Sequence, residues 1–141
     1  MSEDFAADAS SANAPLLTPI GVVESSLCSL EAAPKQGSEG GPDAWIHIRP
    51  QYLEGLQGLR PGDALLVLTW LDRADRQVLS VHPRDDLQNP LTGVFRTRSA
   101  DRPNPIGLHP VTVHEIREGR LLVGPLEAVN GTPVLDLKPV L

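Results

Sequence analysis

Residues 97–107 read TRSADRPNPIG and form the stretch of this chain best suited to hold a ligand. The two prolines fix their own φ angles and push the residues before them, Arg102 and Asn104, into extended backbone, so the segment cannot be a central strand. A stiff backbone of this kind loses little conformational entropy when one of its side chains binds a ligand. The guanidinium groups of Arg98 and Arg102 suit carboxylates and phosphates. Gly107 permits either a bend or the close approach of another group.

The same residues are equally consistent with a rigid turn that joins two strands and leaves its arginines in solvent. Most motifs of common catalytic or cofactor sites are missing, since no two glycines are separated by a single residue and no Walker or G-x-S-x-G sequence occurs. None of the four histidines pairs with another at the four-residue spacing of a helix, and His109 and His114 would lie on opposite faces of a strand. We therefore expect no metal site, and we expect each histidine, including His47 and His82, to be a surface or lightly hydrogen-bonded residue.

The charges are distributed unevenly along the chain. The net charge is −6, and the excess of acidic residues lies in residues 1–43, where Lys35 is the only basic residue. Between Arg73 and Arg102, six arginines accompany four aspartates. This local excess of positive charge favours either a modest anion-binding patch or a set of solvated arginines on loops.

Short runs rich in β-branched residues, separated by turns of glycine and proline, predict about seven or eight strands and almost no helix. The expected strands lie at 19–25, 44–50, 64–73, within 76–86, at 92–99, twice within 108–128 and once within 130–141. A short helical turn is expected where leucines recur at every third position from Leu53 to Leu59. The pattern predicts an all-β fold, namely a single small, mostly antiparallel β-barrel with little helix, and a sandwich is the alternative.

Alternation within two of these strands makes specific predictions about their faces. Over 92–99 it places Val94, Arg96 and Arg98 on one face of a strand. In the hairpin at 108–128 it places Val113 and Ile116 on opposite faces.

The first residues do not fit this pattern of strands. Residues 1–15 are acidic, lack the basic and apolar regions of a signal peptide, and are predicted to be a disordered tail. Residues 16–141 are predicted to be the folded domain. No stretch approaches the roughly 18 apolar residues that a membrane helix needs, so we expect a cytoplasmic protein.

The proline-rich motif and its flanking residues resemble a known family signature. The sequence GVFRTRSADRPNPIGLHPV resembles the signature of the TsaA-like family, in which G-V-F-x-T-R-S is followed by R-P-N-P-I-G. The segments PIGVVESSL, APKQG and NGTPVLDLKP are similar to the opening strand, the Pro-basic-Gln loop and the closing strand of that family. The resemblance extends over residues 19–139 with its elements in order.

The resemblance implies a β-barrel that binds S-adenosylmethionine and forms a homodimer with the cofactor near the subunit interface. It also implies tRNA as the partner, because the best-understood members methylate N6 of threonylcarbamoyl-adenosine at position 37. Carried over by position, the implied cofactor contacts are Lys35, Gln36, Asp72, Arg73, Arg98, Leu108, Glu127, Ala128, Val129 and Asn130.

Chemistry suggests roles for some of these residues. Arg98 suits the carboxylate of the cofactor, whereas Arg102 and Asn104 are assigned to substrate binding. The nitrogen that accepts the methyl group has a delocalised lone pair, so its deprotonation should help, and either Asp72 or Glu127 is a candidate base.

Two alternatives stay open beside a tRNA methyltransferase. The same barrel and cofactor could act on a small molecule, which the acidic first third and the lack of the C-terminal region found in many members favour. A catalytically silent binding module is the other alternative. In addition, Asp72 stands where the family commonly has histidine, and Asn130 where it commonly has aspartate.

Overall fold

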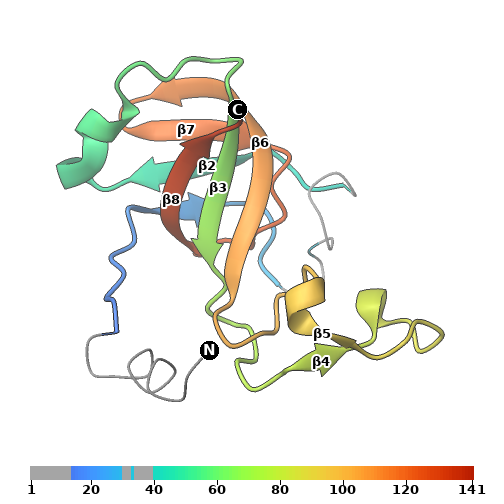
Figure 1. Ribbon diagram of the computed structural model, residues 1–141. Helices are drawn as coiled ribbons and strands as arrows, with labels where there is room; N and C mark the ends of the chain where they lie inside the picture. Colours follow the sequence, from blue (N-terminus) through green and yellow to red (C-terminus); the bar gives the residue numbers. More distant parts are fainter. Residues whose placement is uncertain (1–13, 30–32, 34–39) are drawn as a thin grey trace.

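The computed structural model describes residues 14–29, 33 and 40–141, and its centre is a closed barrel of six antiparallel strands (Figure 1). Around the barrel the strands follow the order β1-β2-β7-β6-β3-β8, so every barrel strand is paired on both sides. The barrel strands are β1 (Gly21–Glu24), β2 (Ala44–Ile48), β3 (Ala64–Trp70), β6 (Ile106–Arg117), β7 (Arg120–Gly124) and β8 (Pro133–Pro139). This architecture confirms the predicted antiparallel barrel and excludes the alternative sandwich.

Aliphatic side chains from alternate strand positions fill the inside of the barrel. In β2, for example, Ala44, Ile46 and Ile48 are buried, whereas the residues between them are only half-buried. The other strands contribute Val23, Leu65, Val67, Val111, Val113, Leu121, Val123 and Val134 to the same core. A small barrel of this kind has an interior just wide enough to be filled by side chains, and here β-branched residues and leucines fill it.

A short helix covers one end of the barrel. The 3-10 helix η2 (Pro50–Leu56) follows β2, and Tyr52, Leu56 and the subsequent Leu59 pack against the core. The predicted helical turn around Leu53–Leu59 is therefore present, although it begins earlier, at a proline that suits the first turn of a helix.

The long connections between strands leave the barrel at its other end. Strands β1, β3 and β7 end where β2, β6 and β8 begin, as the pairings of Trp70 with Ile106 and of Ala44 with Val123 show. The chain therefore leaves and re-enters the barrel at this end through residues 25–29 and 40–43 and through the connections over residues 71–105 and 125–132, and we call this region the loop end. In Figure 1 it is the end towards which the β3 arrow points.

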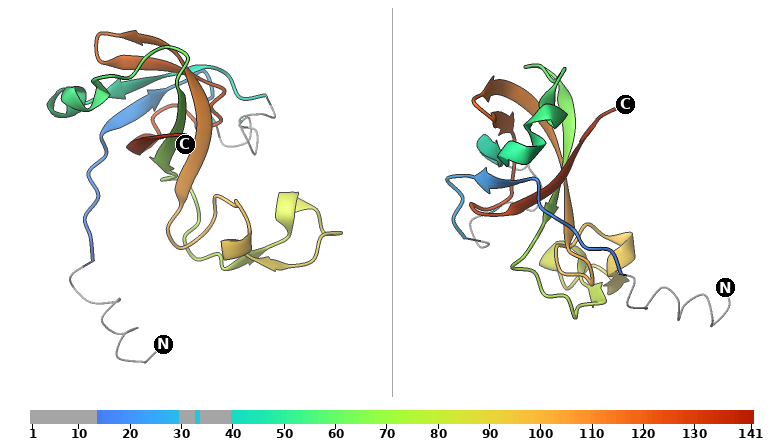
Figure 2. Two further views of the ribbon diagram at one scale, coloured as in Figure 1. Left: turned by 45° about the horizontal axis from the view of Figure 1, so that its top comes forward. Right: turned by 90° about the vertical axis from the view of Figure 1, so that its left-hand side faces the viewer.

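Part of the connection between β3 and β6 forms a small separate sheet. Strand β4 (Ser80–Val81) pairs only with β5 (Thr92–Gly93), and the 3-10 helices η3 (Pro83–Asp85) and η4 (Val94–Arg96) flank them. We call residues 79–96 the arm. Figures 1 and 2 show that the arm projects away from the barrel beyond the loop end.

The prediction of a strand over residues 92–99 is wrong beyond Gly93. The carbonyl of Val94 accepts hydrogen bonds from the backbone N–H of Thr97, at 3.0 Å, and from the Thr97 hydroxyl, also at 3.0 Å, and these bonds close a helical turn. As a result Val94 is buried while Arg96 and Arg98 are exposed, so the three side chains do not share a face.

The predicted hairpin between β6 and β7 is confirmed, but its faces differ from simple alternation. The register shifts between Val113 and Glu115, so that Val113 lies opposite Val123 and Ile116 lies opposite Leu121. The bulge inserts one residue and reverses the phase of the strand after it. Ile116 consequently packs against the core on the same side as Val113.

Most of the predicted disordered tail, residues 1–15, falls outside the described residues, so its disorder stays a prediction. Within the described ranges, the helices are all too short or too polar to cross a membrane.

Candidate functional site

The rigid segment identified in the sequence lies at the loop end and is held by Arg102. Its Nη1 donates to the carbonyls of Thr97, at 3.0 Å, and Ser99, at 2.9 Å, and its Nη2 donates to the carbonyl of Val94, at 3.0 Å. A guanidinium has five N–H donors, so these bonds leave two for other groups. Arg102 thus ties η4 and the residues after it into one compact loop, and its predicted contact with substrate stays a prediction.

A second arginine, which the sequence did not single out, fastens the proline-rich segment to the end of β3. The Arg76 Nε donates to the carbonyl of Pro103, at 2.7 Å, and its Nη2 donates to Asn104 Oδ1, at 3.2 Å. Its guanidinium also lies over the ring of Trp70, 5.1 Å from the ring centre. The side-chain amide of Asn104 is thereby engaged, which leaves its predicted role with substrate untested.

The segment after β7 is the second wall of the loop end. Asn130 accepts a hydrogen bond from the backbone N–H of Ser25 through its Oδ1, at 3.0 Å, and its own N–H donates to the carbonyl of Leu27, at 2.6 Å. Ala128 and Val129 are buried. The predicted cofactor-binding segment 127–130 is therefore anchored to the residues that follow β1.

The residues that follow β1 also contact the chain just after β3. The Arg73 Nη1 lies 3.4 Å from the carbonyl of Cys28, to which it donates, and the backbone N–H of Leu71 donates to Pro105, at 2.8 Å. Asp72, next to Arg73, is exposed, and its carboxylate has no hydrogen-bond or ion-pair partner among the described residues. The structure therefore brings Asp72, Arg73 and the segment 127–130 to one end of the barrel.

The remaining predicted cofactor contacts are placed differently. Arg98 is exposed and, within the described part of the chain, has no hydrogen-bond or ion-pair partner. The side chain of Leu108 lies on the outer face of β6 and is 38% exposed. Lys35 and Gln36 lie outside the described residues.

Inside the loop end lies a hydrogen-bonded chain of three polar side chains, and the sequence pointed to only one of them, Glu127, as a site residue. His109 Nδ1 is 2.5 Å from Glu127 Oε1, and His109 Nε2 is 2.7 Å from Thr69 Oγ1. Thr69 is fully buried and His109 is 3% exposed, so the prediction that every histidine is a surface or lightly hydrogen-bonded residue is wrong at His109. An imidazole can lie in this apolar barrel because both of its nitrogens find partners.

Strand phase was the signal that could have found these residues. In β3, Thr69 continues the buried positions Leu65 and Val67. In β6, His109 lies in phase with the buried Val111. A polar side chain that points into the barrel needs a hydrogen-bond partner there. Only the fold shows that Thr69 and His109 bond to each other and that His109 also bonds to Glu127.

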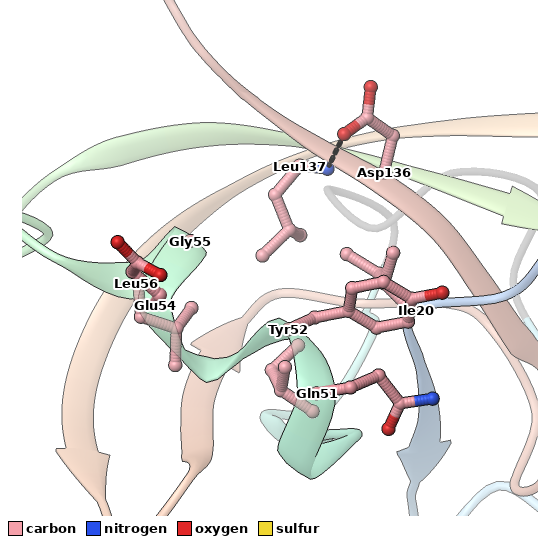
Figure 3. A pocket seen from close by; sticks show the side chains of 9 residues that line it. Ile20, Gln51, Tyr52, Glu54, Gly55, Leu56, Asp136 and Leu137 are labelled. Carbon is pink, nitrogen blue, oxygen red and sulfur yellow. Dashed lines mark hydrogen bonds between the residues drawn. The ribbon is translucent and has the colours of Figure 1, made fainter.

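A hollow on the surface lies away from the loop end. It has a volume of about 490 Å³ and is lined by residues before β1, in η2 and in β8, at the end of the barrel opposite the loop end. Figure 3 shows the side chains of Ile20, Tyr52 and Leu137 gathered around it. None of the predicted site residues lines this hollow. Over residues 14–29, 33 and 40–141, no three His, Cys, Asp or Glu side chains are grouped so as to hold a metal ion.

Comparison with known proteins gives consistent results. Residues 22–141 match the tRNA-methyltransferase O N-terminal domain family. An S-adenosyl-L-methionine-binding protein of Archaeoglobus fulgidus is 41% identical over 123 residues, which cover 87% of each chain. A probable S-adenosyl-L-methionine-binding protein of Methanocaldococcus jannaschii is 44% identical over 97 residues, which cover 66% of this chain and 77% of the relative.

Solved structures show the same fold. The crystal structure of TrmO from Pseudomonas aeruginosa superposes with a TM-score of 0.73 at 27% identity and covers 93% of this chain. A second TrmO crystal structure has the same TM-score at 30% identity. The match spans 58% of the length of each of these solved chains.

The contacts of Arg102 lead to a prediction about the loop itself. Arg102→Lys should accelerate amide hydrogen exchange over residues 94–99, because an ammonium cannot reproduce the fork that reaches three carbonyls. We expect the free energy of unfolding to fall by about 1–3 kcal/mol, measured by urea denaturation. Arg96→Lys, at an exposed neighbouring position, is the control. Unchanged exchange over 94–99 in Arg102→Lys would mean that these bonds do not hold the loop.

Proposed function

The chain belongs to the tRNA-methyltransferase O N-terminal domain family, and on this premise we propose that it is an S-adenosylmethionine-dependent methyltransferase acting on N6 of threonylcarbamoyl-adenosine at position 37 of tRNA. The main support is the convergence of Asp72, Arg73 and the segment 127–130 at the loop end, where three connections of the barrel meet. The names of the relatives from Archaeoglobus and Methanocaldococcus support the choice of cofactor.

The donor set at the loop end fits this cofactor. Bound S-adenosylmethionine supplies a methyl group on a positively charged sulfur, and the transfer needs alignment of the reacting atoms rather than a metal. Exposed Arg98 is free to pair with a carboxylate, which suits the methionyl end of the cofactor. The anchored backbone of residues 127–130 offers a fixed surface for the rest of the molecule.

Two carboxylates at the loop end can take the proton that the methyl-accepting nitrogen must lose. Asp72 is exposed and has no partner in the described part of the chain. Glu127 is only 15% exposed and is held by His109 through one oxygen. A general base must be fixed within hydrogen-bonding distance of the proton that it removes, and this requirement favours Glu127 over Asp72.

Recognition of tRNA fits the arginines around the loop end, although the chain as a whole is acidic. Arg98 and Arg73 are exposed there, and guanidinium groups can bind phosphates with two parallel hydrogen bonds. A protein that modifies tRNA in this way works in the cytoplasm, and we include that location in the proposal.

We also propose that the protein is a homodimer. The arm exposes several large apolar side chains, with Phe95 82%, Leu79 66% and Leu91 62% exposed. The carbonyl of Leu79 accepts a hydrogen bond from Val94 at 3.0 Å, so Leu79 and Phe95 belong to the same part of the arm. Several large apolar side chains exposed on one short segment are consistent with an interaction site, and a second copy of the chain would cover them.

Loss of the Arg98 guanidinium should weaken cofactor binding. Calorimetric titration with S-adenosylmethionine should give a dissociation constant roughly ten- to a hundredfold higher for Arg98→Ala, the loss expected for a charge-assisted hydrogen bond. Arg96→Ala removes a neighbouring exposed arginine and should leave the constant unchanged. Equal affinities of Arg98→Ala and the parent protein would overturn the assignment of Arg98, and no heat from the parent at near-millimolar cofactor would leave only a binding module.

The substrate can be tested in cells. Transfer RNA from cells lacking the gene should contain unmethylated threonylcarbamoyl-adenosine in place of the N6-methylated nucleoside, as measured by nucleoside mass spectrometry. Reintroduction of the gene should restore the methylated form. An unchanged level in the deletion strain would refute the tRNA assignment and favour a small-molecule substrate for the same barrel.

The dimer can be tested by sedimentation. The parent protein should sediment as a dimer at micromolar concentration, and Phe95→Asp should shift it to a monomer because a charge would then lie in the apolar contact. Leu16→Asp changes a leucine outside the arm that is even more exposed than Phe95, and this variant should remain dimeric. A monomeric parent protein would contradict the proposal.

A further inference from the structure

We infer that Thr69 and His109 are positioning residues that hold the Glu127 carboxylate ready to accept the proton of the methyl-accepting nitrogen. The inference rests on the proposed function and concerns the interior of the loop end, where these side chains form a continuous hydrogen-bonded chain. Thr69 and His109 are buried and act through Glu127, which alone of the three reaches solvent.

The identity of each partner defines the direction of the hydrogen bonds. An ionised carboxylate only accepts, so His109 Nδ1 carries a proton and donates to Glu127 Oε1, at 2.5 Å. The other nitrogen, Nε2, is then the acceptor of the neutral ring, and the Thr69 hydroxyl donates to it at 2.7 Å. The Glu127 carboxylate therefore favours the tautomer with its proton on Nδ1, and the Thr69 hydroxyl, which can donate, supplies the partner that Nε2 of this tautomer needs inside the barrel.

A glycine in the backbone leaves space for these hydrogen bonds. Gly107 lies beside Thr69 across the β3–β6 ladder, and a Cβ atom there would be 2.2 Å from Thr69 Oγ1 and 2.5 Å from His109 Nε2. Any side chain at Gly107 would thus displace one of the two groups. Because Gly107 has no side chain, Thr69 and His109 can form their hydrogen bond beside it. This is the close approach of another group that a glycine at this position permits.

Glu127 is held at both ends of its side chain. Its neighbours Leu126 and Ala128 are buried in the core, which fixes the backbone, and His109 holds Oε1. Across the described residues, every buried side-chain nitrogen or oxygen has a hydrogen-bond partner, and Oε2 of Glu127 has none. Oε2 is therefore accessible from the surface and available to a ligand at the loop end.

This arrangement supports a balanced transfer step. The new N–CH3 bond forms as the S–CH3 bond breaks, and the electron pair of the broken bond remains on sulfur, which loses its positive charge. The proton of the attacking nitrogen passes to Glu127 Oε2, while the N–H of His109 continues to hold Oε1. A base that is fixed in this way needs no rearrangement during the reaction.

Thr69→Val tests the role of the hydroxyl at almost constant volume. We expect kcat for tRNA methylation to fall about tenfold, with KM for tRNA and the dissociation constant of S-adenosylmethionine within about twofold of the parent values. Thr69→Ser should recover most of the lost kcat, because it keeps the hydroxyl. Thr112→Val, a change of the same type on the exposed face of β6, is the control and should leave kcat unchanged.

A double-mutant cycle separates action through Glu127 from a general loss of stability. Glu127→Gln should lower kcat at least as much as Thr69→Val, and adding Thr69→Val to Glu127→Gln should lower it no further. Independent, multiplicative losses would overturn the inference. So would a Thr69→Val protein whose kcat equals that of the parent.

The tautomer of His109 provides a readout that needs no activity. Nitrogen-15 spectra should show a protonated Nδ1 and an unprotonated Nε2 for the His109 ring, identified by comparison with His109→Gln. A ring protonated at Nε2 instead would overturn the inference even in an active enzyme. If the parent protein shows the expected tautomer but does not methylate tRNA, the proposed substrate fails and the positioning of Glu127 stands.

Discussion

Strand β3 closes the barrel, and the positions of the loops and of the polar side chains follow from this closure. The strand pairs with β6 on one side and with β8 on the other, and these two ladders bring together residues 64–70, 106–112 and 134–139. In a closed antiparallel barrel the connections must leave alternately at the two ends. The connections after β3 and β7 consequently leave the barrel at the same end as the residues that directly follow β1, whereas the opposite end is covered by η2.

The irregular connections at the loop end need partners for their backbone carbonyls, and arginines supply them. Arg102 satisfies three carbonyls around η4, and Arg76 and Arg73 each satisfy one more. The contacts of Arg102 are half-buried, where carbonyls without partners would be costly, whereas those of Arg76 and Arg73 are exposed. Arg102 in particular thus belongs to the architecture of the loops. Within the described part of the chain Arg98 is not used in this way, which leaves its guanidinium available to a carboxylate or phosphate.

The interior of the barrel combines an ordinary apolar core with one polar exception. Thr69 and His109 occupy inward positions that a valine or a leucine could fill, and burying them is tolerable because each is hydrogen-bonded. The absence of a side chain at Gly107 leaves the space in which this hydrogen bond forms. Three inward positions on two strands thus depart from simple core packing, and all of them act on Glu127 at the surface.

The sequence by itself determined the class of fold and the family. Alternation, glycine and proline predicted β2, β3 and the β6–β7 hairpin because these signals are local, and the proline-rich motif predicted a rigid segment outside the sheets for the same reason. The strand predicted over residues 94–99 was wrong, because hydrogen bonds to the Val94 carbonyl outweigh strand propensity there. The face predicted for Ile116 was also wrong, because a bulge reverses the phase of β6.

The tertiary structure alone decided which arginines serve the backbone and that His109 lies inside the barrel between Thr69 and Glu127. These residues are far apart in sequence, and their contacts depend on the register of paired strands. A periodicity along one strand shows which residues face inward, but it does not by itself identify the residue that lies opposite on the partner strand.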